Sequence, residues 1–291
     1  MTTHTQSAPA HAAKSDQSGD VHSAFLDDKI ELPNLPEVAW KVREAIEDPD
    51  ISVDKIAQIV QNDPAIAARL VQVANSPLYC GLTKVENLRM VIGRLGLNAT
   101  QSLVTLLAVK QLFRAKTALI KTRFKVLYEH STSVAALCTA VADRLPGLDR
   151  ERACLCGLLH DIGVIPILTR ADKQPDFFTT PEQLEQTIVE LRTHTGSWVL
   201  QQWSFDGEML EIVREARNWN RDMIGKADYC DVVNCALLLK QAMDGDSDNV
   251  VDIHDIPLGS KLAESGLVIV SYKDFIDEAK DIIDSIRGSL N

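Results

Sequence analysis

The feature that most constrains the fold is a helical spacing of apolar residues that recurs along almost the whole chain. Val38, Val42 and Ile46 share one face of a helix, as do Val134 and Val141. No segment shows the strict apolar–polar alternation of a half-buried strand, and aromatic residues, which favour sheets, make up only 5% of the chain. Apolar stripes of this kind are buried by packing helix on helix. The sequence therefore predicts an all-α protein.

Capping residues divide the chain into individual helices. Ser52 and Asp63 have side chains that accept hydrogen bonds from a first helical turn, and Pro64 suits the first helical position. Asn98 is a candidate cap of the same kind, and the 146–147 Pro-Gly pair ends the longest stripe. Helices are predicted at about 36–46, after residue 52, and at about 64–75, 85–95, 99–113, 122–145, 150–162, 181–203, 207–218, 227–243 and 272–286, with a polar loop from 163 to 180.

The same breaks predict four regions. Residues 1–24 are rich in small and polar side chains and predict a disordered tail, because they bury too little apolar surface to offset the entropy of ordering. Residues 25–115 form an N-terminal helical subdomain, which packs on a helical bundle at 122–245. Residues 246–291 hold an acidic loop and a C-terminal helix expected to dock back on the first subdomain.

The charge balance bears on partners. The formal net charge of −11 repels phosphate backbones, so we expect no nucleic acid partner. One local basic run is interpreted as a solvated loop between two helices. Its members are Lys110, Arg114, Lys116, Lys121, Arg123 and Lys125.

Cysteine usage and hydropathy bear on the compartment. The six cysteines are irregularly spaced without a C-x-x-C pair, which gives no support for a zinc or redox motif. The N-terminus lacks the apolar core of a secretory signal, and no run approaches the apolar length that spans a bilayer. We therefore expect a cytoplasmic protein that does not enter a membrane.

An adjacent His-Asp pair is the most informative motif. His160 and Asp161 project about 100° apart if they lie on a helix, close enough to reach one cation. Imidazole and carboxylate suit a hydrolytic metal such as Mn, Fe or Mg, but such a site needs further ligands. His130 is a candidate, because it lies beside Leu127 and Val134 on the core side of its helix. Alternatively, His160 and Asp161 bond each other or nearby helix ends without a metal.

Several motifs in order resemble the HDOD proteins, the HD-related output domains of bacterial signalling. The likeness covers nearly everything from about residue 30 to residue 286 and rests on short segments in a specific order and spacing. These segments are Leu32–Val38 (LPNLPEV), Gln61–Leu70 (QNDPAIAARL), Val73–Tyr79 (VANSPLY), Val91–Leu97 (VIGRLGL), Glu129–Ser131 (EHS) and Gly157–Gly163 (GLLHDIG).

The resemblance implies a degenerate version of a metal site. In related HD phosphohydrolases a His, a His-Asp pair and a later Asp hold the metal, and His130, His160 and Asp161 match the first three. The later Asp would fall at 232–238, which has no carboxylate. Asp231 is the nearest, almost two turns from the end of that segment. His194 matches a further recurring position, whereas residues 215–220 lack the imidazole that the family usually has there, and the Gly-Tyr-Pro signature of cyclic-dinucleotide phosphodiesterases is absent.

We therefore expect an N-terminal helical subdomain packed on an HD-like bundle, with no metal, no cofactor and no catalytic residue. His130, His160, Asp161 and His194 are candidates for a vestigial site. The resemblance implies a non-catalytic regulatory module that binds a protein partner of a signalling pathway, or a small ligand near the histidines. The alternative function is that of a metal-dependent phosphohydrolase or phosphodiesterase.

Two further motifs are open to more than one interpretation. Residues 54–75 imitate a helix-turn-helix, but their apolar content favours core packing over DNA reading. Residues 244–255 imitate the calcium loop of an EF-hand. There Asp255 replaces the bidentate Glu, and Pro257 should obstruct an exiting helix, so we favour a solvated acidic loop.

Overall fold

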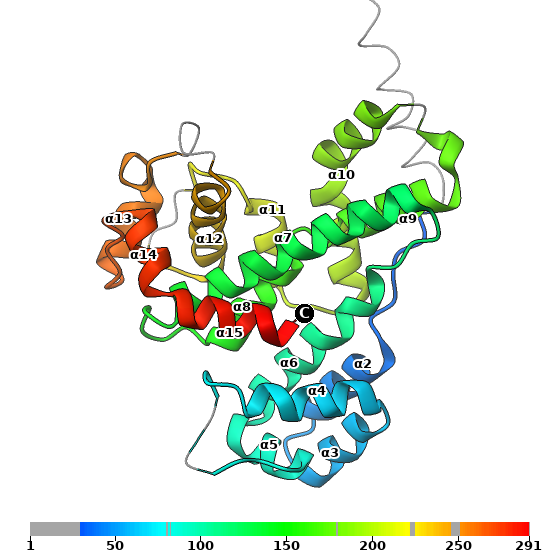
Figure 1. Cartoon of the computed structure of the whole chain (residues 1–291), viewed down its shortest axis with the longest axis vertical. Coiled ribbons are helices and arrows are strands. Elements are labelled where there is room, and N and C mark those ends of the chain that lie inside the picture. Colours follow the sequence, from blue (N-terminus) through cyan, green and yellow to red (C-terminus); the bar gives the residue numbers. More distant parts are fainter. Residues whose placement is uncertain are drawn as a thin grey trace, which may run out of the picture.

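The computed structural model describes residues 30–79, 81, 83–178, 180–221, 225–245 and 251–290. These residues form helices joined by turns and loops, with no strand among them, which confirms the all-α fold (Figure 1). The tail predicted at residues 1–24 lies outside the described residues.

The first group of helices follows the capping signals closely. It comprises α2 (Glu37–Ile46), α3 (Val53–Gln61), α4 (Pro64–Ala74), α5 (Leu88–Leu95), α6 (Leu97–Val109) and the short 3₁₀ helix η1 (Lys110–Leu112). Ser52 accepts a hydrogen bond from a backbone N–H of α3, and Asp63 accepts two from α4. The prediction that Asn98 caps α6 was wrong. The helix begins at Leu97 because Gly96 takes a φ of 82°, which a glycine adopts without strain.

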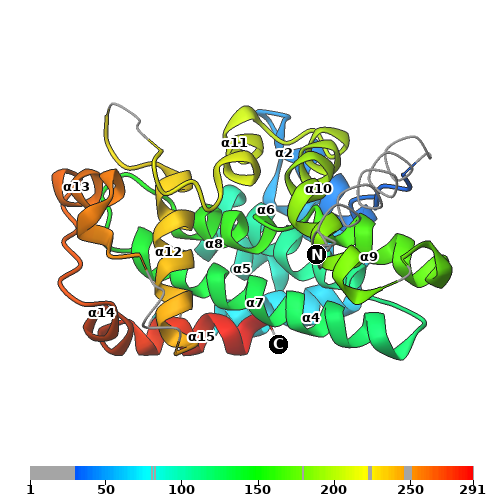
Figure 2. The ribbon, with the colours of Figure 1, turned by 90° about the horizontal axis from the view of Figure 1, so that it is seen from above.

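The second group surrounds one long helix. It comprises α7 (Ala118–Ala142), α8 (Arg150–Leu159), α9 (Val164–Lys173), η2 (Pro175–Phe177), α10 (Pro181–Gln202), α11 (Gly207–Glu215) and α12 (Tyr229–Met243). All residues from Ser131 to Ala142 are buried. Figure 2 shows α8, α12 and α15 (Lys280–Leu290) around α7. Lys121, Arg123 and Lys125 belong to α7, so the interpretation of these three as loop residues was wrong.

The region predicted as a polar loop at 163–180 contains α9, a helix that we did not predict. Ile165, Ile167 and Leu168 are buried, and Pro166 is tolerated because it lies in the first turn, where a missing N–H costs no helical hydrogen bond. The segment Arg150–Lys173 is therefore apolar and long enough to cross a membrane by length and composition, contrary to expectation. Because 89% of its most apolar window is buried inside the structure, it has the character of a core segment.

The C-terminal region holds η3 (Ile253–Asp255), α13 (Pro257–Glu264), α14 (Tyr272–Glu278) and α15 (Lys280–Leu290). The single helix predicted at 272–286 was wrong, because the chain breaks at Ala279 between α14 and α15. Pro257 begins α13 and does not obstruct a helix. Figure 1 shows α15 beside α7 with its end near α4, where Arg69 donates hydrogen bonds to the carbonyls of Gly288 and Ser289.

Two glycines permit the close approach of helices around the His-Asp pair. A Cβ on Gly157 would lie 2.7 Å from Cα of Ala135, so only glycine lets α8 approach α7 this closely. A Cβ on Gly163 would lie 1.9 Å from the carbonyl oxygen of Arg192 and 2.4 Å from the amide nitrogen of Gly196. α8 is thus held against α7, and the turn after Asp161 is held against α10.

Candidate functional site

Three of the predicted site residues meet in the core. His130 comes from α7. His160 and Asp161 had been placed on a helix at 150–162, but they lie in the turn that follows α8, which ends at Leu159. The two histidine Nε2 atoms are 3.3 Å apart. Oδ2 of Asp161 lies 3.1 Å from Nε2 of His160 and 3.8 Å from Nε2 of His130. These are the atoms that a metal ion would bind.

Hydrogen bonding fixes the orientation of one imidazole. Nδ1 of His160 lies 2.7 Å from the carbonyl oxygen of Gly157, and because a carbonyl can only accept, this nitrogen must donate. Nε2 of His160 is consequently the atom that faces His130 and Asp161. The carbonyl of Gly157 thus fixes the orientation of His160 through its Nδ1, as outer-shell groups do for histidines in metal sites.

The surroundings lower the pKa values of the two partners of His160. Burial of the imidazole, assisted by the neighbouring His160, lowers the pKa of His130 to about 3, so His130 is neutral at physiological pH. Burial by itself would raise the pKa of Asp161, but its contacts with His160 and Arg217 hold that pKa well below its usual range. The site therefore contains a permanently ionised carboxylate.

Arg217 neutralises that carboxylate. Its Nη1 donates to Oδ1 of Asp161 at 3.0 Å and its Nη2 donates to Oδ2 at 2.6 Å. Such two-pronged pairing is the strong form of an arginine–carboxylate contact. Only 7% of the Asp161 side chain is exposed to solvent, against 25% for Arg217. Both carboxylate oxygens therefore face a fixed cation that comes from the protein itself.

The loop that presents Arg217 is held by the segment in which a later carboxylate was expected. Asn234 is buried on α12, and its Oδ1 accepts a hydrogen bond from the backbone N–H of Arg217 at 2.7 Å. Its Nδ2 donates to the carbonyl of Glu215 at 3.1 Å. Arg217 has a φ of 70°, an uncommon conformation for a residue with a side chain, and this clamp supports it.

Sequence reasoning placed the histidines and the aspartate but missed Arg217 and Asn234. It recorded the missing imidazole at 215–220 and the missing carboxylate at 232–238 as two separate losses. The structure links them, because the amide in the second segment holds the arginine of the first. The available signal was a strong cation in the stretch where the family has an imidazole.

Residues 32–219 match the HDOD domain. The chain belongs to the HDOD family. A solved structure from Shewanella amazonensis, provisionally named a metal-dependent phosphohydrolase, is 29% identical, with a TM-score of 0.78 over 94% of this chain and 99% of that one. An HDOD protein of unknown function from Geobacter sulfurreducens is 21% identical, with a TM-score of 0.65 over 94% and 97% of the two chains.

Two further relatives extend the HDOD comparison. A protein from Marinobacter aquaeolei, provisionally named a signal transduction protein, is 19% identical, with a TM-score of 0.59 over 96% of this chain and 66% of that one. An uncharacterised protein from Treponema pallidum is 23% identical over an alignment of 207 residues, and the match covers 67% of this chain. The match spans about 40% of the length of that curated relative.

The remaining predicted residues of the HDOD site lie apart from the cluster. His194 is exposed on α10, and its ring packs edge-on against Trp198 with 4.3 Å between centroids. Asp231 belongs to a different ion cluster, in which it binds Nη1 of Arg221 at 2.7 Å and Nζ of Lys261 at 2.6 Å. Among the described residues, neither adds a ligand to the histidines and Asp161.

A resident divalent metal fits this HDOD cluster in distance but not in charge. The three candidate ligand atoms lie within 4.8 Å of one another, close enough to surround one ion. However, Arg217 already balances the charge of Asp161. Arg192 is a second nearby cation, and its pKa is lowered by burial and by the charge of Arg217. A dication would therefore enter a site with two arginines and a single carboxylate, and it would have to displace Arg217.

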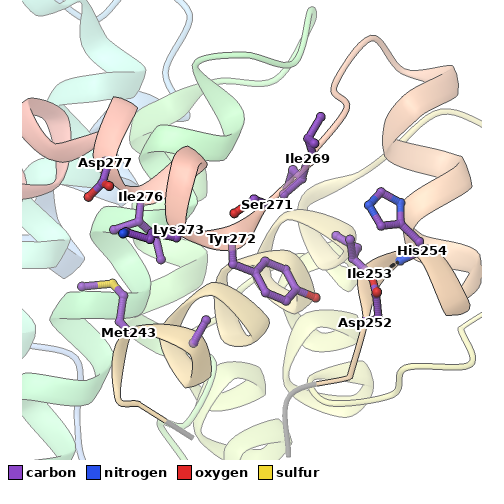
Figure 3. Close-up of a pocket in the computed structure, with 12 residues that line it drawn as sticks. Met243, Asp252, Ile253, His254, Ile269, Ser271, Tyr272, Lys273, Ile276 and Asp277 are labelled. Atoms are coloured by element: carbon purple, nitrogen blue, oxygen red, sulfur yellow. Dashed lines mark hydrogen bonds between the residues drawn. The ribbon is translucent and has the colours of Figure 1, made fainter. Parts of the chain in front are cut away.

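A larger cavity lies away from the histidines. It has a volume of about 740 Å³ and opens between the end of α12 and the start of α14, where Tyr272 donates a hydrogen bond to the carbonyl of Val251 (Figure 3). Its lining residues Met243 and Asp252 flank residues 246–250, which are outside the described range. Residues 246–250 also belong to the calcium-loop motif at 244–255, and within its described part Asp244 pairs with Lys240.

Proposed function

We propose that this HDOD protein is a non-catalytic regulatory module that acts by binding a protein partner in a signalling pathway. The observation that carries the proposal is the two-pronged ion pair between Arg217 and Asp161. In a hydrolytic HD site the carboxylate helps to hold an ion that acidifies a bound water. Here a guanidinium faces the carboxylate, and a guanidinium does not coordinate water as a Lewis acid or lose a proton.

The packing of the histidines suits the same proposal. With Nδ1 of His160 committed to a carbonyl, the remaining nitrogen faces other side chains at 3.1–3.3 Å. The cluster is best explained as a buried polar network that fixes α7, α8 and the loop after α11.

The location of the protein in the cell belongs to the same proposal. Five described cysteines, on α7, α8 and α12, are buried free thiols, which suits a reducing cytoplasm. The name of the Marinobacter relative is consistent with signalling, whereas the name of the Shewanella relative favours the alternative, a metal-dependent phosphohydrolase. That alternative requires Arg217 to leave Asp161 when a metal binds.

A hydrolysis assay separates the two functions. Wild-type protein and the His160→Ala variant are incubated with bis(p-nitrophenyl) phosphate, ATP and cyclic dinucleotides in Mn²⁺, Fe²⁺ or Mg²⁺. We expect both proteins to give the same background rate with every metal. Turnover by the wild type that depends on metal and disappears in His160→Ala would contradict the proposal.

A further inference from the structure

A second cavity of about 630 Å³ lies where α4, the end of α6, α7 and the last turn of α15 meet. Five cationic side chains line it, and its lining contains no aspartate or glutamate. This is notable on a chain with a net charge of −11, because it concentrates positive potential at one place. We call it the basic groove, and its cations are Arg69, Lys110, Arg114, Lys121 and Lys125.

The positive charge of the basic groove is only partly neutralised by the protein. Within the described part of the chain, Arg114 and Lys121 make no ion pair with a carboxylate, and both are exposed. Lys125 has a single long contact, 3.8 Å to Glu129, and 74% of its side chain is exposed. Contacts of this length between exposed groups contribute little. The α7 side of the groove therefore offers charge to an outside partner.

One end of the groove already binds a negatively polarised group. Tyr128 donates to the carbonyl of Leu290 at 2.6 Å, and Lys110 donates to the same oxygen at 3.2 Å. Arg69 donates to the carbonyl of Ser289 at 3.0 Å. These carbonyls form the C-terminal end of α15, where the helix dipole places negative charge. The groove thus holds a helical segment by its negative end.

The floor of the groove is apolar. Ile66, Leu107 and Phe124 line it from α4, α6 and α7, and the ring of Phe113 packs edge-on against that of Tyr128 with 5.0 Å between centroids. A site for a free phosphate needs donors that converge on one point. A floor of aliphatic and aromatic groups between cationic side chains suits a ligand with apolar groups on one face and carboxylates on its edges.

We infer that the basic groove binds an acidic, amphipathic peptide segment of a partner protein. Lys121 and Lys125 lie one turn apart on α7 and, together with Arg114 in the segment just before α7, meet carboxylates of the peptide segment. Apolar side chains of the segment pack on the half-buried Leu107 and Phe113, as in other helix-in-groove complexes. The inference uses residues away from the His-Asp cluster, so metal-dependent hydrolysis at that cluster would leave it standing.

Selection from random 12-residue peptides displayed on phage, with the full chain immobilised, tests this inference. We expect the enriched peptides to carry an excess of Asp and Glu together with at least one large apolar residue. Synthetic copies should bind with an affinity that falls as salt rises and that falls about tenfold in the Lys121→Glu/Lys125→Glu variant. Lys55→Glu/Lys84→Glu, which reverses two exposed lysines outside the groove, is the matched control and should bind like the wild type.

Three results would overturn the inference. The first is the absence of any enriched acidic peptide. The second is equal binding by the groove variant and the control variant. The third is one-to-one binding of inorganic tripolyphosphate in calorimetry that displaces the peptides and is lost in the groove variant, because the groove would then be a site for a small phosphate ligand.

Discussion

On the proposed function, replacing Arg217 by methionine should allow the cluster of His130, His160 and Asp161 to bind a metal ion. Methionine keeps the length and apolar stem of the side chain but removes the guanidinium that donates to both oxygens of Asp161. The carboxylate, 7% exposed, is then left with His160 at 3.1 Å as its partner. Three ligand atoms within 4.8 Å of one another become available to an ion.

The size of the effect follows from burial. Removing one partner of a buried ion pair costs about 3–5 kcal/mol. Because a quarter of the Arg217 side chain is exposed and His160 remains in place, we expect about 2–3 kcal/mol for Arg217→Met without metal. For a domain of this size that lowers Tm by roughly 4–12 °C. Metal at about a hundred times its Kd returns about 2.7 kcal/mol and raises Tm by roughly 5–11 °C.

Differential scanning calorimetry in EDTA and in Mn²⁺ measures both changes. Arg214→Met, which changes an exposed residue on α11 three positions before Arg217, is the control and should match the wild type, whose Tm should not respond to Mn²⁺. Arg217→Lys keeps one positive charge, so its Tm and its response to Mn²⁺ should lie between those of the wild type and Arg217→Met. This variant serves as the test if Arg217→Met folds poorly. Equal Mn²⁺ stabilisation of the wild type and Arg217→Met would refute the reasoning, since Arg217 would then not exclude metal.

Three further predictions concern the frame around the cluster. Gly163→Ala would place a Cβ 1.9 Å from a carbonyl oxygen of α10, so it should lower the free energy of unfolding, measured by urea titration, by more than about 3 kcal/mol. Gly288→Ala is the control and should not destabilise the protein, because no atom lies within 4 Å of the added Cβ. The pKa of His130 is about 3 in the folded protein, below the value near 6.5 in the unfolded chain, so the unfolded chain binds an extra proton between pH 6.5 and 5. The free energy of unfolding should therefore fall as pH drops through this range. His130→Gln should remove up to about 1.4 kcal/mol per pH unit of that slope. Asn234→Ala removes the acceptor of the Arg217 N–H and should cost about 1–3 kcal/mol, and an unchanged urea midpoint would show that this clamp is unimportant.

The sequence predicts most helices because their signals are local. Ser52 and Asp63 act within three residues of themselves, and the structure shows their capping bonds. His130 could be assigned to the cluster because the stripe around Leu127 and Val134 fixes which way that face of α7 points. The helical spacing of apolar residues predicted the all-α fold and the His-Asp pair stood out as a motif, whereas the HD-like arrangement came from the family resemblance. The match over residues 32–219 confirms the family.

Features that depend on distant segments could not be predicted. Arg217 reaches Asp161 from a loop at positive φ, and the residue that holds this loop, Asn234, lies on another helix. The basic groove gathers Arg69 from α4 and Lys121 from α7, although the sequence suggested only a charged connection. α9 was missed because residues 163–180 were interpreted as one polar loop.

The metal content of the wild-type protein tests the central claim, which is that Arg217 neutralises the carboxylate of Asp161 in place of a metal ion. Protein purified without chelator is dialysed against a mixture of Mn²⁺, Fe²⁺ and Zn²⁺, freed of unbound ions and measured by inductively coupled plasma mass spectrometry. We predict a small fraction of one ion per chain, unchanged in His160→Ala. A value close to one ion per chain that is lost in His160→Ala would contradict the account.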